Sequence, residues 1–73
     1  NYRLASMIKR TLYFGNPAYL RLANEQLVIE LPEGKETKSA PIEDLGVVIL
    51  DHQQVTISTG AMAKLLEHNV ALV

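Results

Sequence analysis

The sequence predicts a mainly β domain, a small β-sandwich of short antiparallel strands with one α-helix near the C-terminal end. Apolar and polar residues alternate in residues 8–14, 18–22 and 26–31, which is the pattern of half-buried strands. Residues 47–50 are four consecutive branched or aliphatic residues, which indicate a strand covered on both faces. Residues 59–68 follow a serine and carry apolar side chains at helical spacing.

Short turns join the first three predicted strands, so we expect them to form an antiparallel meander. Residues 15–17, Gly-Asn-Pro, make the first turn, and residues 24–25, Asn-Glu, make the second. Alternation also assigns the side chains of each strand to one face or the other. The side chains that it places on the outward face of the first two strands are Lys9, Thr11, Tyr13, Tyr19 and Arg21.

The middle of the chain predicts an exposed loop and three further strands. Residues 32–39 are charged and contain a glycine, which is typical of a solvent-exposed hairpin loop. A short strand at residues 39–42 should return from this loop. The buried strand at residues 47–50 follows, then a polar turn at residues 51–54 and a β-branched strand at residues 55–57.

One helix is predicted between the last two strands. Ser58 is suited to the N-cap, because its hydroxyl can accept a hydrogen bond from an early helical N–H group. Asn69 is suited to a left-handed C-cap. His68 falls in the last turn, where a cation is favoured by the helix dipole. The apolar stripe that should face the core consists of Met62, Leu65 and Leu66, with Ala61 beside it.

Composition limits the possible functions. The 73 residues allow one domain, and a core of this size rarely supplies more than about 3–5 kcal/mol of stability. Without cysteine, neither a disulfide nor a cysteine-based zinc site is possible. Seven Lys and Arg against eight Asp and Glu argue against a protein that coats nucleic acid. No apolar run approaches the roughly 18 residues of a membrane span and no export signal is visible, so we expect a cytoplasmic protein with no membrane partner.

The two ends of the sequence predict a piece of a longer protein. Met7 has the character of a natural start, so residues 1–6 are expected to be an extension and residues 7–73 the domain. Residues 70–73, Val-Ala-Leu-Val, are an apolar strand that the chain does not complete. We therefore expect the longer protein to continue beyond residue 73.

The outward face of the first hairpin is the best candidate for a functional surface. Lys9 and Arg21 could contact phosphates, and the rings of Tyr13 and Tyr19 could stack on a terminal base. The same residues also fit a solvated sheet face or a protein interface. The pattern alone leaves these three interpretations open.

No catalytic or metal-binding residue is predicted. Glu43 and Asp44 precede the strand at residues 47–50, and Asp51 and His52 follow it. The two pairs are about 20 Å apart along a strand that rises about 3.3 Å per residue, so one metal ion cannot join them. Turn residues explain all four better than ligands do.

The chain resembles a known family in the order of several short blocks. They are the residues Met7 to Phe14, Leu27 to Ile29, Pro41 to Leu50, Ile57 to Gly60, and Leu65 with Leu66. In this order they are similar to the N-terminal domain of the CRISPR-associated spacer-acquisition integrase, also called the universal adaptation nuclease, with most similarity to its type II branch. The resemblance covers Met7 to Val73.

This resemblance implies a role in DNA integration without catalysis by this chain. The full-length relatives carry a glutamate, a histidine and a further acidic residue that bind a divalent metal in a helical C-terminal domain. Magnesium or manganese is therefore expected only in the longer protein, and no cofactor in this chain. The metal-dependent endonuclease activity would likewise belong to the longer protein.

The resemblance also implies partners. They are a second copy of the chain in a homodimer, the second CRISPR adaptation protein, and double-stranded DNA with splayed ends. A tyrosine that wedges against the terminal base pair would be Tyr19 first and Tyr13 second. The alternative hypothesis is a stand-alone β-rich protein-interaction module with no nucleic-acid role, which the near-neutral charge and the exposed tyrosines favour.

Overall fold

The computed structural model describes residues 8–34 and 36–73. The expected extension, residues 1–6, and the expected start at Met7 lie outside these residues. The elements, in chain order, are β1 (Arg10–Phe14), β2 (Ala18–Ala23), β3 (Gln26–Glu30), η2 (Pro32–Gly34), β4 (Thr37–Pro41), η3 (Ile42–Asp44), β5 (Leu45–Leu50), β6 (Val55–Ile57), α1 (Thr59–Glu67) and β7 (Ala71–Leu72), where η denotes a 3-10 turn.

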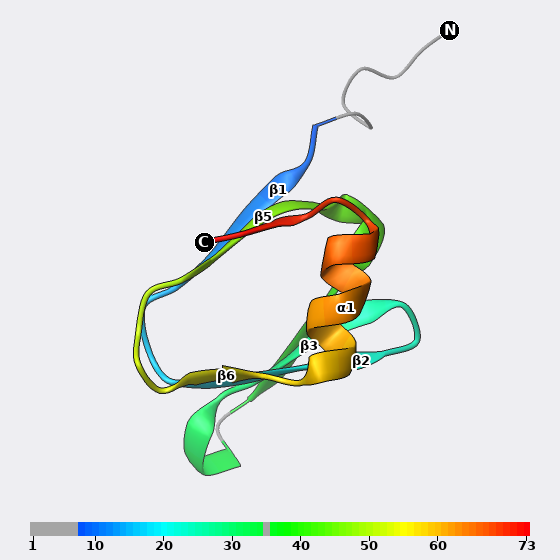
Figure 1. Cartoon of the computed structure of the whole chain (residues 1–73). Coiled ribbons are helices and arrows are strands. Elements are labelled where there is room, and N and C mark those ends of the chain that lie inside the picture. The colour runs from blue at the N-terminus through cyan, green and yellow to red at the C-terminus, as the bar shows by residue number, and fades with distance from the viewer. Residues whose placement is uncertain (1–7, 35) are drawn as a thin grey trace, which may run out of the picture.

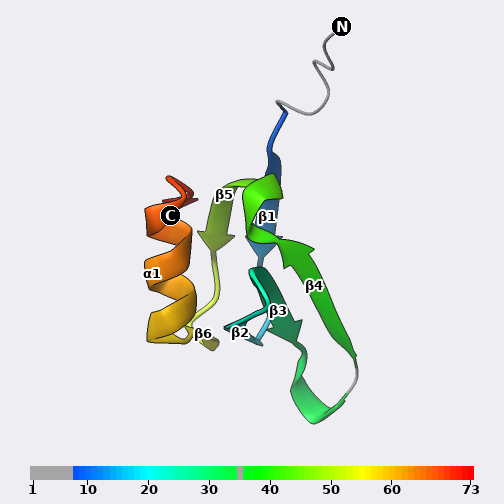
Figure 2. The ribbon, with the colours of Figure 1, turned by 90° about the vertical axis from the view of Figure 1, so that its right-hand side faces the viewer.

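Two stacked sheets and one helix confirm the predicted mainly β class (Figure 1). The three-stranded sheet has the order β1-β5-β7, and the four-stranded sheet has the order β4-β3-β2-β6. Figure 2 shows α1 along one side of the sandwich and β4 at the opposite side. The helix therefore closes one of the two open sides between the sheets.

The strand pairing differs from the expected antiparallel arrangement. β2, β3 and β4 do form an antiparallel meander, but β1 pairs in parallel with β5 in the other sheet. The β2–β6 and β5–β7 pairings are also parallel. The physical reason is that residues 15–17 carry the chain across the sandwich and do not reverse it, so Leu12 and Phe14 pack toward the core from the sheet opposite Leu20.

The core lies between the two sheets and beneath the helix. Its largest fully buried side chains come from both sheets, from η3 and from α1: Leu20, Leu27, Ile42, Leu65 and Val48. Full burial of an aliphatic side chain of this kind stabilises a fold by about 1.5–3 kcal/mol. The two sheets, η3 and the helix thus depend on one shared core.

β5 is buried less evenly than its apolar sequence predicted. Val48 is fully buried, but Val47 and Ile49 are only half-buried. The prediction of cover on both faces was therefore wrong, because no described element lies over the outer face of the three-stranded sheet. Leu45 also faces the core, three residues before Val48, because the β1–β5 register shifts by one residue at Gly46.

The helix begins where the sequence predicted but buries a different stripe. Ser58 is the N-cap, and its Oγ accepts a hydrogen bond from the Ala61 N–H at 3.1 Å. Ala61 and Leu65 are buried, whereas Met62 is 37% exposed and Leu66 is 55% exposed. The small Ala61 side chain allows close packing on the sheet, and this turns Met62 and Leu66 toward solvent.

The predicted turns are confirmed in three places. Asn24 and Glu25 both have positive φ, as a two-residue hairpin turn requires. Asn69 has φ +60° after the helix, as its expected C-cap role requires. Residues 32–34 are exposed, as expected, although β4 already begins at Thr37.

The close approach of Lys9, just before β1, should require a glycine at position 46. A Cβ atom at Gly46 would lie 2.7 Å from the Lys9 Cβ, which is fixed to the backbone and cannot swing away. We expect Gly46→Ala to lower the free energy of unfolding by about 1–3 kcal/mol, the usual cost of overpacking. Urea denaturation followed by circular dichroism measures this change.

Gly60 provides the matched control. It lies in α1 with no atom within 4 Å of an added Cβ. Gly60→Ala should leave the stability unchanged or raise it by up to about 1 kcal/mol. Equal stability changes in the two variants would contradict the close β1–β5 approach.

Candidate functional site

The structure separates the four predicted contact residues into two pairs. Lys9 and Tyr13 lie just before and within β1, in the three-stranded sheet, whereas Tyr19 and Arg21 lie on β2, in the four-stranded sheet. Alternation turns both pairs away from the core, but the two sheets stack face to face. The expectation of one shared outward face was therefore wrong, and Tyr13 and Tyr19 lie on opposite outer faces of the sandwich.

Tyr19 lies on a polar outer face of the four-stranded sheet. Its neighbours across the strands are Thr56 on β6 and Glu30 on β3, and Glu30 in turn pairs with Thr37 on β4. Tyr19 is 40% exposed and borders a shallow cavity of about 280 Å³. The residues that line this cavity are Pro17, Ala18, Tyr19, Glu30, Leu31, Pro32, Gln54 and Thr56.

Arg21 forms an ion pair that the sequence analysis missed. Its Nε donates to Glu30 Oε2 at 2.5 Å, and both side chains are about 40% exposed. An ion pair with this exposure contributes at most about 1 kcal/mol. Glu30 lies diagonally across the β2–β3 register, which the sequence could have indicated once this hairpin was fixed. A phosphate would have to compete with Glu30 for the guanidinium group.

Tyr13 is held by the turn that follows β5. Its hydroxyl donates to Asp51 Oδ2 at 2.6 Å, and its ring lies over Gly15. The hydrogen bond to Asp51, and then the negative charge of that carboxylate, raise the pKa of Tyr13 above its ordinary value of 10.0. The hydroxyl therefore already forms a hydrogen bond within the molecule, although Tyr13 remains 61% exposed.

Lys9 and Arg10 carry the positive charge at the start of β1. The Lys9 ammonium donates to the carbonyl oxygen of Glu43, which satisfies one donor and leaves the charge unneutralised. Arg10, the first residue of β1, is also exposed. No carboxylate of residues 8–34 and 36–73 forms an ion pair with Lys9 or Arg10.

The acidic and imidazole residues around β5 serve as turn residues, as expected. Glu43 and Asp44 lie in η3, before the strand, and Asp51 and His52 follow it. His52 Nδ1 accepts a hydrogen bond from the Gln54 N–H at 3.0 Å. Among residues 8–34 and 36–73, no three His, Cys, Asp or Glu side chains gather closely enough to hold a metal ion.

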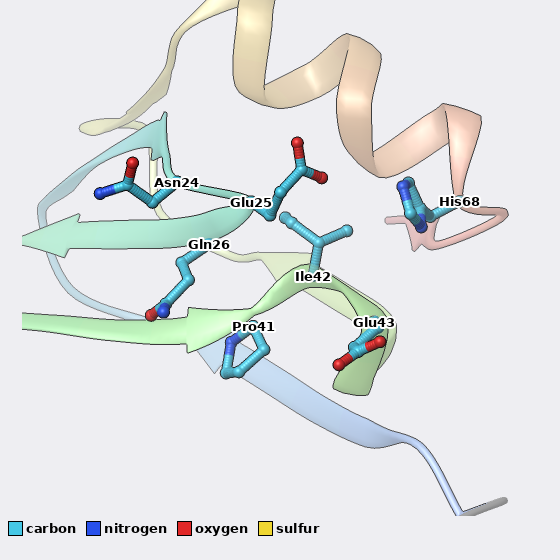
Figure 3. Close-up of a pocket in the computed structure, with 7 residues that line it drawn as sticks. All are labelled: Asn24, Glu25, Gln26, Pro41, Ile42, Glu43 and His68. Atoms are coloured by element: carbon cyan, nitrogen blue, oxygen red, sulfur yellow. The ribbon is translucent and has the colours of Figure 1, made fainter.

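A larger cavity of about 440 Å³ opens at the end of the sandwich where η3, the β2–β3 turn and the end of α1 meet (Figure 3). It is lined by Asn24, Glu25, Gln26, Pro41, Ile42, Glu43 and His68. Glu25 at its rim pairs with Lys64 of the helix, with 3.3 Å between Nζ and Oε2. Because the carboxylates of Glu25 and Glu43 both line this cavity, it is not suited to phosphate.

The comparisons with known proteins agree with the fold. A family model for CRISPR associated protein Cas1 matches residues 12–73. A solved chain from the crystal structure of a TtCas1-DNA complex is 27% identical and has a TM-score of 0.69. The match covers 82% of this chain and 21% of that chain, so this chain spans about a fifth of the solved one. No curated protein sequence matches significantly. In the described part of the chain, α1 is too short to cross a membrane.

The Tyr13–Asp51 hydrogen bond can be tested by titration. Since Asp51 raises the pKa of Tyr13, Asp51→Asn should lower the pKa of one tyrosine toward its ordinary value. The stability that the bond contributes is present below pH 10 and is lost as the pH rises through the raised pKa in the folded chain. Ultraviolet absorbance of tyrosinate against pH measures the shift, and Tyr13→Phe identifies the residue. An unchanged titration in Asp51→Asn would contradict the bond.

Proposed function

The chain belongs to the CRISPR associated protein Cas1 family, and from this we propose that it positions DNA ends and pairs with a second copy during spacer integration. The resemblance predicted from the sequence is confirmed by the family match over residues 12–73. Under this proposal, the chain is a non-catalytic N-terminal part of the integrase. The observation that carries the DNA role is the exposed Tyr19 ring beside a shallow cavity.

Tyr19 is proposed to stack on the terminal base of a splayed duplex. An aromatic ring that is partly exposed on a sheet face is a general platform for an unpaired base, and such stacking contributes about 1–3 kcal/mol per base. Thr56 and Gln54 line the same cavity and can donate hydrogen bonds to it. The solved relative was crystallised in complex with DNA, which supports a DNA role for the family.

The cations available for phosphates are few. Within residues 8–34 and 36–73, no carboxylate lies in ion-pair range of Lys9, Arg10 or Lys38, whereas Arg21 and Lys64 are paired with glutamates. With a formal net charge of −1, this chain should hold DNA weakly by itself. The remaining affinity is proposed to come from other parts of the longer protein.

The metal and the partners of the integrase are proposed on the family resemblance. The described residues do not fit a divalent metal site, so magnesium or manganese would be held elsewhere in the longer protein. Self-association is further supported by the exposed apolar side chains of Ile8 and Val73. The second adaptation protein is assigned no contact residue on this chain.

A protein-interaction module without a nucleic-acid role is the second candidate. The near-neutral charge and the exposed apolar residues favour it. The two candidates differ in one measurable property. Only the DNA-positioning role predicts that splayed DNA shields the polar outer face around Tyr19 from solvent.

Tyr19→Ala should weaken the binding of a duplex with splayed ends. Loss of one stacked base predicts a Kd about 5- to 150-fold higher, whereas Tyr19→Phe should keep most of the affinity. Fluorescence anisotropy at low salt measures both. Tyr13→Ala, on the opposite outer face, is the matched control and should have the smaller effect. Equal affinities of the wild-type chain and Tyr19→Ala would remove the support for a wedge at Tyr19.

The chain alone should neither cleave nor join DNA. Incubation of the purified chain with splayed duplex and either magnesium or manganese should leave the strands intact on a denaturing gel, because the described residues offer no metal site. Metal-dependent cleavage that copurifies with the chain would contradict the proposal that catalysis lies elsewhere.

A further inference from the structure

The cavity of about 440 Å³ at the end of the sandwich is built from three segments that hold one another in place. The Ile42 N–H donates to the Glu25 carbonyl oxygen at 3.1 Å, which fixes η3 against the β2–β3 turn. The Lys64 ammonium lies 3.3 Å from Glu25 Oε2, which ties the same turn to α1. The His68 N–H donates to the Lys64 carbonyl oxygen at 3.1 Å and so keeps His68 at the end of the helix. The walls of the cavity are therefore formed before any ligand binds.

The lining combines hydrogen-bonding groups with an apolar part (Figure 3). Ile42 is 1% exposed and supplies the apolar part together with Pro41. Glu25 and Glu43 supply two carboxylates. The other polar side chains of the lining are Asn24, Gln26 and His68. Among the described residues, neither a lysine nor an arginine lines this cavity.

The two carboxylates are not fully neutralised within the molecule. Glu43 is exposed, and no ammonium or guanidinium group of residues 8–34 and 36–73 lies in ion-pair range of it. Lys9 reaches Glu43 at the backbone carbonyl oxygen and not at the carboxylate. The Lys64 ammonium that pairs with Glu25 also lies 3.7 Å from Glu67 Oε1, so two carboxylates share one cation. The lining therefore keeps a net negative charge.

We propose that this cavity binds an arginine side chain of a partner protein. A guanidinium group is planar and always charged, and its five N–H donors match the oxygens of carboxylates. These donors can be shared between Glu25 and Glu43, while the methylene stem of the arginine packs on Ile42. The volume of about 440 Å³ falls within the range of about 300–1,000 Å³ of sites that enclose small ligands.

Charge complementarity favours arginine over other occupants. Phosphate groups would be repelled by the two carboxylates, which disfavours the backbone of DNA. A divalent metal needs several close oxygen ligands, and among residues 8–34 and 36–73 no three acidic or imidazole side chains gather closely enough. An apolar side chain would leave the carboxylates and amides without partners. A lysine matches the charge but lacks the planar fork that pairs with a carboxylate.

The cavity is separate from the surface that carries the proposed DNA role, and arginine binding does not rest on that role. The cavity lies at the β2–β3 turn, whereas Tyr19 lies at the other end of β2. The two cavities share no lining residue. Tyr19→Ala should therefore leave arginine binding unchanged, so the failure of either proposal does not decide the other.

The test is an NMR titration of the chain with a blocked tripeptide, acetyl-Gly-Arg-Gly-amide. The matched control ligand carries citrulline, which keeps the shape of arginine without its charge. The arginine peptide should shift the amide signals of Glu25, Ile42, Glu43 and His68 in a saturable way. The citrulline peptide should bind at least about fivefold more weakly, because its hydrogen bonds are not charge-assisted. Equal affinities of the two peptides would overturn the inference.

Two variants test the site in opposite directions. Glu43→Gln removes one charge from the lining and should raise the Kd of the arginine peptide about 2- to 5-fold, as expected for an exposed ion pair. Lys64→Gln releases Glu25 from its ion pair and should lower the Kd, an effect that a loss of folding cannot produce. Glu36→Gln, at the opposite end of the β3–β4 hairpin, is the matched control and should leave the Kd unchanged.

Three further results would overturn the inference. Signals that shift only outside the β2–β3 turn, η3 and His68 would place the binding elsewhere. Shifts that do not saturate at tens of millimolar peptide would show that the cavity does not bind arginine. A single-stranded oligonucleotide that shifts the same signals more strongly than the peptide would make the cavity a nucleic-acid site.

Discussion

The sandwich depends on a bend between the two sheets. The segment from β1 to β2 and the segment from β5 to β6 both make this bend. β1 and β5 run in parallel in one sheet, and after the bend β2 and β6 run in parallel in the other (Figure 1). At the bend, the Asp51 N–H donates to the Phe14 carbonyl oxygen at 2.8 Å, and the Tyr13 hydroxyl donates to the Asp51 side chain. These bonds join the end of β1 to the residue that follows β5, where both segments leave the three-stranded sheet.

The bend explains why the two outer faces differ. A side chain that points outward before the bend lies on one side of the molecule, and one that points outward after it lies on the other. β1 and β5 thus place Tyr13, Val47 and Ile49 on an apolar surface, whereas β2 and β6 place Tyr19 and Thr56 on a polar one. A small domain can then present two different outer surfaces that do not overlap.

The sequence predicted the elements better than their partners. Alternation identifies which residues share a face of one strand, and it correctly buried Leu20, Leu27 and Ile29. It does not specify which strand lies alongside, and residues 15–17 look the same whether the chain reverses or crosses between sheets. The Ser58 cap was predictable because capping is local. The exposure of Leu66 was not predictable from the sequence, because it depends on how closely the helix approaches the sheet.

The candidate site shows the same difference between local features, which the sequence predicts, and strand pairing, which it does not. The outward positions of Tyr19 and Arg21 followed from the period of a strand, and both were correct. The pairing of Arg21 with Glu30 required the β2–β3 register, and the separation of Tyr13 from Tyr19 required the sheet assignment. The prediction of functional surfaces on small β domains is thus limited by long-range strand pairing, because the pattern of a single sequence does not show which strands pair.

β1 lies outside the antiparallel meander and pairs in parallel with β5, and the rest of the fold depends on this pairing. Nuclear Overhauser effects between backbone protons of the folded chain test it most directly. The parallel pairing of Leu12 with Val48 should give the pattern of a parallel ladder, with no cross-strand contacts between β1 and β2. Strong antiparallel contacts between residues 8–14 and 18–22 would contradict it, because Tyr13 and Tyr19 would then share one face.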